Sequence, residues 1–125
     1  MKKMTKIEII TRQEKLEALK DGLNKIGVTG MTVTHVLGYG LQKGHTEVYR
    51  GTEYNVTLLP KVKVEIVVCE VPVEDVIETA KTVCRTGNVG DGKIFVYGID
   101  NAVRIRTGEE GDSAIIDPAD IHKLK

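Results

Sequence analysis

The order of two hydrophobic periods along the chain constrains its fold more than any other feature. Four segments alternate apolar and polar residues, as strands with one buried face do, and two segments repeat apolar residues at helical spacing. The alternating segments are 6–10, 31–37, 61–68 and 94–99, and the helical ones are 16–26 and 72–84. The chain is therefore predicted to run strand, helix, strand, strand, helix, strand.

This order predicts an α+β protein with a ferredoxin-like βαββαβ fold, in which two helices cover one face of an antiparallel four-stranded sheet. Thr11 and Glu14 have the spacing of a capping box, so we expect them to begin the first helix. The uncovered face would carry apolar residues among charged ones, namely Ile10, Val67, Phe95 and Tyr97. Such a face predicts a homo-oligomer with clefts between its subunits.

Length and charge exclude several classes of protein. A chain of 125 residues suits one domain, and 18 basic residues balance 18 acidic ones, so no overall field attracts nucleic acid or an anionic membrane. The sequence shows no apolar run of the roughly 20 residues that cross a bilayer and no export signal. We therefore expect a cytoplasmic protein whose two cysteines, Cys69 and Cys84, stay reduced.

The glycine-rich segment 86–93, Thr-Gly-Asn-Val-Gly-Asp-Gly-Lys, is the sharpest local motif. Glycines let backbone amides converge on an anion, and Lys93 adds a positive charge, which suits phosphate. Gly87 to Lys93 also matches a Walker A loop, but Ile94 replaces its Ser or Thr, and the loop leads from a helix into a strand. A glycine-rich connection with an exposed lysine is the alternative interpretation.

Arg104 and Arg106 alternate in a short predicted ribbon, which would direct both guanidinium groups to one side. With Lys93 they would form a tri-cationic pocket suited to a polyphosphate. The alternative is an edge strand that its charges protect from aggregation.

The interval between the second and third predicted strands, residues 38–54, contains four glycines and is longer than an ordinary hairpin loop. We interpret it as a mobile arm, with an insertion of no function as the alternative. The three histidines lack metal-ligand spacing, and the chain has no nucleophile elbow. No set of catalytic residues is therefore indicated.

Several motifs together resemble those of the PII nitrogen-regulatory signal transducers, over roughly residues 1–115. The stretches that carry the resemblance are 30–34 (Gly-Met-Thr-Val-Thr), 42–47 (Gln-Lys-Gly-His-Thr-Glu), 49–54 (Tyr-Arg-Gly-Thr-Glu-Tyr), 86–96 and 104–109 (Arg-Ile-Arg-Thr-Gly-Glu). The resemblance implies a ferredoxin-like homotrimer with a long T-loop at about residues 38–55. Residues 116–125 would be a C-terminal extension.

The resemblance implies a regulatory binding protein rather than an enzyme. PII trimers bind ATP or ADP in clefts between subunits and take up 2-oxoglutarate together with Mg-ATP. Their T-loop then engages or releases ammonium transporters, nitrogen-assimilation enzymes or regulators. Such a protein would meet the membrane only through a transporter partner and would not bind nucleic acid.

The resemblance also assigns individual positions. Nucleotide-binding residues would be Thr32, Val64, Gly87, Asn88, Val89, Gly90, Asp91, Gly92, Lys93, Arg104 and Arg106. The 2-oxoglutarate site would comprise Gln42, Lys43, Gly44 and Lys61, with Gln42 completing the Mg²⁺ shell. Tyr54 stands where many relatives are uridylylated and Thr52 where some carry a phosphorylated serine, so the resemblance leaves the modifying chemistry open.

The sequence departs from the family pattern at several positions. Leu41 replaces a frequent Arg, Asn88 a frequent Lys, and Arg12-Gln13 a Lys-Pro pair. The changes at Leu41 and Asn88 bear on the discrimination between ATP and ADP and on the charge of the cleft. Two other functions stay open: a small ATPase or phosphotransferase, and a PII-like sensor of another small ligand, against which the retained Gln42 and Lys61 weigh.

Overall fold

The computed structural model describes residues 3–40, 47–49, 52–54 and 57–116, and for residues 40, 47–49, 52–54 and 57 it describes the backbone alone. The strands are β1 (Thr5–Arg12), β2 (Thr32–Gly40), β3 (Glu47–Tyr49), β4 (Thr52–Tyr54), β5 (Thr57–Val68) and β6 (Lys93–Gly98). The helices are α1 (Leu16–Lys25), which follows a 3-10 turn at Gln13–Lys15, α2 (Val73–Cys84) and α3 (Asp112–Ile115).

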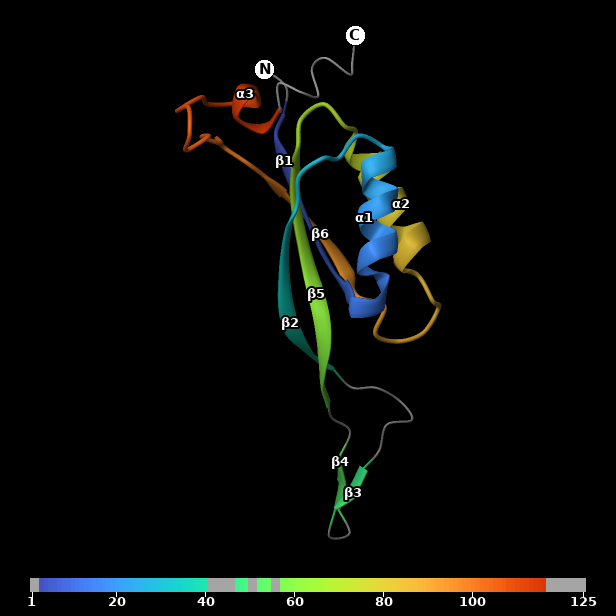
Figure 1. Ribbon diagram of the computed structural model, residues 1–125. Helices are drawn as coiled ribbons and strands as arrows, with labels where there is room; N and C mark the ends of the chain where they lie inside the picture. The colour runs from blue at the N-terminus through green and yellow to red at the C-terminus, as the bar shows by residue number, and fades with distance from the viewer. Residues whose placement is uncertain (1–2, 41–46, 50–51, 55–56, 117–125) are drawn as a thin grey trace.

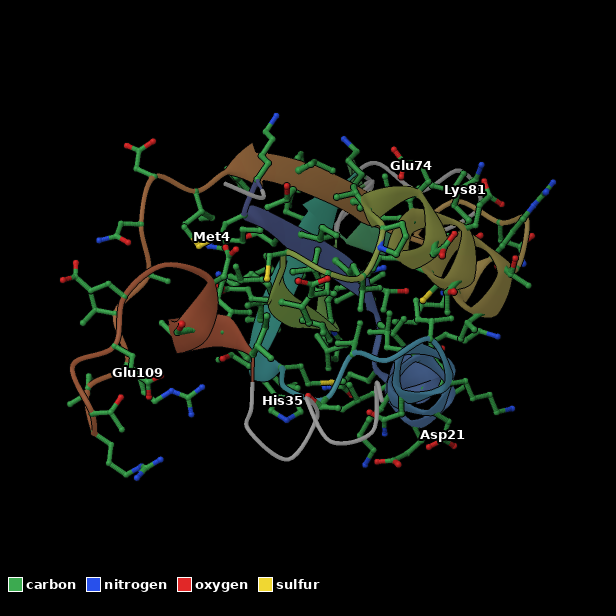
Figure 2. The ribbon with its side chains drawn as sticks, turned by 90° about the horizontal axis from the view of Figure 1, so that it is seen from above. Met4, Asp21, His35, Glu74, Lys81 and Glu109 are labelled. Carbon is green, nitrogen blue, oxygen red and sulfur yellow. The ribbon has the colours of Figure 1, made fainter. Side chains whose placement is uncertain are left out.

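The main sheet has the strand order β2-β5-β1-β6, and every neighbouring pair is antiparallel. Helices α1 and α2 lie side by side against one face of this sheet (Figure 1). Figure 2 shows the layers from above, with Asp21, Glu74 and Lys81 on these helices and Glu109 at the opposite side of the molecule. The predicted ferredoxin-like α+β fold is confirmed.

The core forms where the alternating strands meet the helical stripes. The buried apolar side chains from the sheet include Ile7, Ile9, Val62, Val64 and Ile66, and those from the helices are Leu19, Leu23, Val76, Ala80 and Cys84. Period two sends every second strand residue toward the helices, and the helical period places the stripe of each helix opposite them. The same alternation that predicted the strands therefore builds the core.

The face of the sheet away from the helices carries paired charges and exposed rings. The Lys6 Nζ atom lies 3.2 Å from a Glu65 carboxylate oxygen and 5.2 Å from the centre of the Tyr97 ring. Phe95 and Tyr97 remain 41% and 43% exposed. Self-association through this face stays a prediction.

Two predicted elements differ from the structure. Strand β2 continues into the predicted arm as far as Gly40, and β5 begins at Thr57, before the predicted start of that strand at Lys61; Gly40 and Thr57 are the last pair. Strands β3 and β4 form a separate two-stranded sheet. The ribbon predicted around Arg104 and Arg106 is a turn, closed by an isolated bridge between Val103 and Glu110. The arm's mobility remains a prediction.

Within the described residues, no helix is long and apolar enough to cross a membrane.

Candidate functional site: the glycine-rich loop

The loop between α2 and β6 has a backbone that its glycines make possible. Gly87, Gly90 and Gly92 have φ angles of 90°, 103° and 107°. Side chains with a Cβ atom rarely adopt such angles, whereas glycine does so at little cost. The spacing of the glycines thus sets where the chain reverses direction.

Three consecutive carbonyl groups of this loop are held by the strands beneath it. Arg12 Nη2 donates to the carbonyl of Val89 at 2.9 Å, and Thr11 Oγ1 donates to that of Asp91 at 2.9 Å. Between them, Lys61 Nζ donates to the carbonyl of Gly90. In a trans peptide the N–H group points opposite to the C=O group. The amides of residues 90–92 are therefore directed away from these donors, as an anion-binding backbone requires.

The contact of Thr11 corrects one expectation. Its hydroxyl does not cap the first helix, for neither the 3-10 turn nor α1 has a side-chain cap. The hydroxyl instead binds the glycine-rich loop, 80 positions along the chain. The local spacing predicted a helix cap, but the Thr11 hydroxyl makes a long-range hydrogen bond instead.

The carboxylate of Asp91 occupies the beginning of the loop. It accepts hydrogen bonds from the amides of Thr86 and Gly87, at 2.8 and 2.9 Å, and from the Thr86 hydroxyl. Arg12 Nε lies 3.2 Å from the same carboxylate. The Thr86 hydroxyl and amide, followed by the Gly87 amide and Arg12, hold the pKa of Asp91 far below its usual range. The Gly87 amide, predicted to cradle phosphate, is thus bound to Asp91 in this structure.

Gly92 lies against the end of β1. A Cβ atom at this position would come within 1.7 Å of the Ile10 carbonyl oxygen and 3.1 Å of Thr11 Cα. No side chain can occupy that space without moving backbone. Close packing and three side-chain donors together fix the loop on the sheet.

Lys61 is the buried cation of the site, with 8% of the residue exposed. Burial lowers its pKa, and the nearby Arg12 acts in the same direction. Its ammonium group, predicted to meet 2-oxoglutarate, contacts Gly90 in this structure. The other predicted residues of that site, Gln42, Lys43 and Gly44, lie outside the described residues, as does Leu41.

The structure does not bring the three predicted cations together within one chain. Lys93 begins β6, whereas Arg104 lies beyond its far end, where Nη2 donates to the carbonyls of Ser113 and Ile116 at 3.3 and 3.0 Å. In Figure 1 the glycine-rich loop and the segment that leads to α3 lie at opposite ends of the sheet. Arg106 is exposed in the turn. A pocket that uses all three cations therefore needs a second chain.

Val64 has no exposed surface in the single chain, because its side chain points from β5 into the core beneath the helices. Its assignment to the nucleotide stays a prediction. Thr32 is exposed at the start of β2, where a ligand can reach it. Asn88 and Val89 are also exposed.

The proposed modification sites lie on β4. Thr52 and Tyr54 are the first and last residues of that strand, and their Cα partners on β3 are Tyr49 and Glu47. The structure describes only their backbone.

Sequence reasoning missed the functions of Thr11 and Arg12 as anchors of the loop. One signal was present: Arg12 lies two residues beyond the predicted strand 6–10 and on the same face as Ile10, and the structure makes Lys61 its register partner. Two adjacent cations on one sheet face need oxygen partners, and the loop supplies them.

Fold and loop together define a small protein of ferredoxin-like fold whose glycine-rich loop directs backbone amides outward, an arrangement that suits an anion. A family model described as Nitrogen regulatory protein P-II matches residues 4–109. The chain belongs to this family, as its motifs had indicated.

Relatives in several bacteria support the assignment. A Nitrogen regulatory protein P-II of Pasteurella multocida is 54% identical over 112 residues, which cover 90% of this chain and 100% of the relative. A Nitrogen regulatory PII-like protein of Bacillus subtilis is 55% identical and covers 90% of this chain and 97% of its own length. These relatives are named as regulatory proteins, not as enzymes.

Two solved structures are similar to this chain along most of its length. The structure of B. subtilis GlnK has a TM-score of 0.76 at 55% sequence identity, covering 90% of this chain and 98% of that one. A structure described as a complex of B. subtilis GlnK with ATP has a TM-score of 0.75 at 51% identity, covering 90% of this chain and 95% of that one.

Proposed function

We propose that this protein is a trimeric sensor of ATP or ADP and of 2-oxoglutarate that acts in the cytoplasm on nitrogen metabolism. One observation carries the nucleotide part: the carbonyls of Val89, Gly90 and Asp91 are bound from beneath, which leaves the amides of residues 90–92 directed toward a ligand. The ATP complex of the similar GlnK supports the same ligand class.

The phosphates would lie on these amides, with Lys93 as the nearest cation of the same chain. Arg104 and Arg106 would come from a neighbouring subunit, because within one chain they follow the end of β6 opposite to Lys93. Thr32, Asn88 and Val89 would border the nucleotide with their exposed side chains. Binding and trimer formation would then depend on one another.

The second ligand would bind beside the loop. Lys61 is a buried ammonium group, and a carboxylate of 2-oxoglutarate would be a suitable partner for it. Gln42, Lys43 and Gly44 would complete that site. Mg²⁺ would be held by Gln42 together with oxygens of ATP and 2-oxoglutarate, which are the hard ligands this ion prefers.

The T-loop would report the bound state to a partner, either an ammonium transporter or an enzyme or regulator of nitrogen metabolism. A ligand can bias the loop only by binding one of its states more tightly. Gln42 lies in the T-loop sequence and would supply that difference. Modification of Tyr54 or Thr52 would adjust the same segment.

Calorimetry with ATP, ADP and 2-oxoglutarate tests this proposal. We expect both nucleotides to bind, and 2-oxoglutarate to bind only with Mg-ATP. The variant Gln42→Ala should bind ATP and lose 2-oxoglutarate, and undiminished uptake of 2-oxoglutarate would refute the assignment. Size measurement should give three times the 13.8 kDa of one chain.

Two results would replace the proposal with another function. Turnover of Mg-ATP at about 1 s⁻¹ or faster would indicate an ATPase or phosphotransferase. Nucleotide binding without any response to 2-oxoglutarate would indicate a sensor of another small ligand.

A further inference from the structure

The carboxylate of Asp91 is bound by its own loop as a ligand anion would be. Oδ2 accepts the amides of Thr86 at 2.8 Å and Gly87 at 2.9 Å. Oδ1 accepts the Thr86 hydroxyl and lies 3.2 Å from Arg12 Nε. Both oxygens are therefore satisfied by donors from the loop entrance and from β1.

An aspartate in a surface loop is usually well exposed to water, whereas this one is partly covered by its donors. The side chains of Asp91 and Arg12 are each only 23% exposed. Asp91 also receives the Thr11 hydroxyl on its main-chain carbonyl, so one residue joins the loop to β1 through both its side chain and its backbone. Removing the carboxylate would free the loop entrance while leaving the other carbonyl contacts in place.

The charges around the loop still favour an anionic ligand. Arg12, Lys61 and Lys93 contribute three positive charges around the loop, against the negative charges of Asp91 and of Glu14, which acts on Lys61. The Asp91 carboxylate is already paired with Arg12 and with two amides at the loop entrance. The amides of residues 90–92 lie on the outward side of the peptides whose carbonyls are bound from beneath.

We propose that Asp91 is a positioning residue: its carboxylate acts as an internal anion that holds the entrance of the loop and Arg12, and so fixes the amides of residues 90–92 in the arrangement that receives a ligand phosphate. The identity of that ligand rests on the proposed function. The amides of Thr86 and Gly87 therefore belong to Asp91 and not to the phosphate.

The substitution Asp91→Asn separates this idea from simple electrostatics. A side-chain amide has one acceptor oxygen, and its NH₂ group would face donors, so part of the loop entrance would lose its acceptor. Positioning predicts weaker ATP binding, with a Kd raised about tenfold, the loss typical of a charge-assisted contact. Charge repulsion alone predicts the opposite, because the substitution removes a negative charge near the phosphates.

The experiment combines calorimetry with amide NMR spectra of the full chain. The matched control is Asp100→Asn, since Asp100 is an exposed carboxylate beyond the far end of β6. In nucleotide-free protein, Asp91→Asn should shift the amide signals of Thr86 and Gly87, and Asp100→Asn should not. For ATP, only Asp91→Asn should raise the Kd.

A double-mutant cycle with Arg12→Gln distinguishes a specific contact between the two side chains from a general loss of order in the loop. The two side chains contact one another, so their effects on the Kd should be less than additive. Arg12→Gln also keeps the inference testable if Asp91→Asn fails to fold, because it retains the carboxylate and should raise the Kd by itself. An unchanged Kd and unmoved Thr86 and Gly87 signals in Arg12→Gln would then overturn the inference.

Other results would also overturn it. These are tighter or unchanged ATP binding by folded Asp91→Asn, unshifted Thr86 and Gly87 signals, or full additivity in the cycle. If the wild-type protein itself fails to bind ATP or ADP, the proposed function fails. The Thr86 and Gly87 signals would still decide whether Asp91 organises the loop.

Discussion

Gly92 offers the sharpest test of how the loop is held on the sheet. In Gly92→Ala, the new Cβ atom would lie 1.7 Å from the Ile10 carbonyl oxygen and 2.8 Å from its carbon. Both atoms belong to the backbone of β1, so no side-chain rotation relieves the overlap. Either the loop or the strand must move.

Two contributions set the size of the effect. A residue with Cβ at the φ of 107° found at Gly92 costs about 1–2 kcal/mol. Forcing an extra methyl group into a packed site costs roughly 1–3 kcal/mol more. We therefore expect the free energy of unfolding to fall by about 2–5 kcal/mol.

Two matched variants separate these contributions. Gly87→Ala keeps the unfavourable φ, at 90°, but its Cβ would have no atom within 4 Å, so it should lose only about 1–2 kcal/mol. Gly98→Ala has neither an unfavourable φ nor a close neighbour and should change stability by about 0.5 kcal/mol or less. Urea unfolding at one protein concentration compares all three with the wild-type protein.

The order of stability of the three variants tests whether the loop packs against Ile10. Gly92→Ala must be the most destabilised, and its ATP affinity should fall with the displacement of the loop. If it unfolds at the same urea concentration as Gly87→Ala, the loop does not pack against Ile10, and the reasoning about the site is wrong.

Three further predictions concern ionisable groups. Burial raises the pKa of the Cys84 thiol, so iodoacetamide at pH 8 should modify it far more slowly in the folded protein than in urea, as mass spectrometry would show; equal rates would contradict its burial. The pKa of Asp91 is lowered, so its carboxylate stabilises the fold above pH 3.8 and this contribution is lost in acid. The difference in unfolding free energy between wild type and Asp91→Asn should therefore shrink from pH 6 to pH 3. A constant difference would contradict this prediction. Burial lowers the pKa of Lys61, so the folded state releases this proton at a lower pH than the unfolded state does. The wild type should therefore gain stability relative to Lys61→Met as the pH rises toward 10.5. A loss of stability relative to Lys61→Met over this range would contradict the lowered pKa.

Much of the fold was predictable because alternation is a local signal with a physical cause. Residues 61–68 place Val62, Val64 and Ile66 on one side, and these three side chains are 0–2% exposed in the structure. The helix that ends at Cys84 buries the stripe its spacing predicted. The outer ends of β2 and β5 were missed because Gly38 and Gly40 interrupt the alternation of one strand and Pro60 that of the other, and the pairing between the two strands is a contact that a local pattern does not show.

The site was predictable in its location and not in its contacts. The glycines of residues 87–92 showed where amides converge, yet nothing local indicates that Thr11 binds Asp91 rather than the first helix. Val64 was assigned to the nucleotide by family position, although alternation had already placed it on the buried side of its strand. The structure confirms the burial that alternation predicted for Val64, while its contact with a nucleotide stays a prediction.

The separation of the cations argues that the complete site is a property of an assembly. Strand β6 has six residues, which at ~3.4 Å each places Lys93 about 17 Å from Gly98, with Arg104 farther still. The Nε atom of Arg104 is buried and has no hydrogen-bond partner among the described residues, so that end of the chain retains an unused donor. The sheet face between the two ends exposes Phe95 and Tyr97. Contact between subunits through that face can bring the arginine end of one chain toward the glycine-rich loop of the next, and a polyphosphate gripped by both would stabilise the assembly that forms its own binding site.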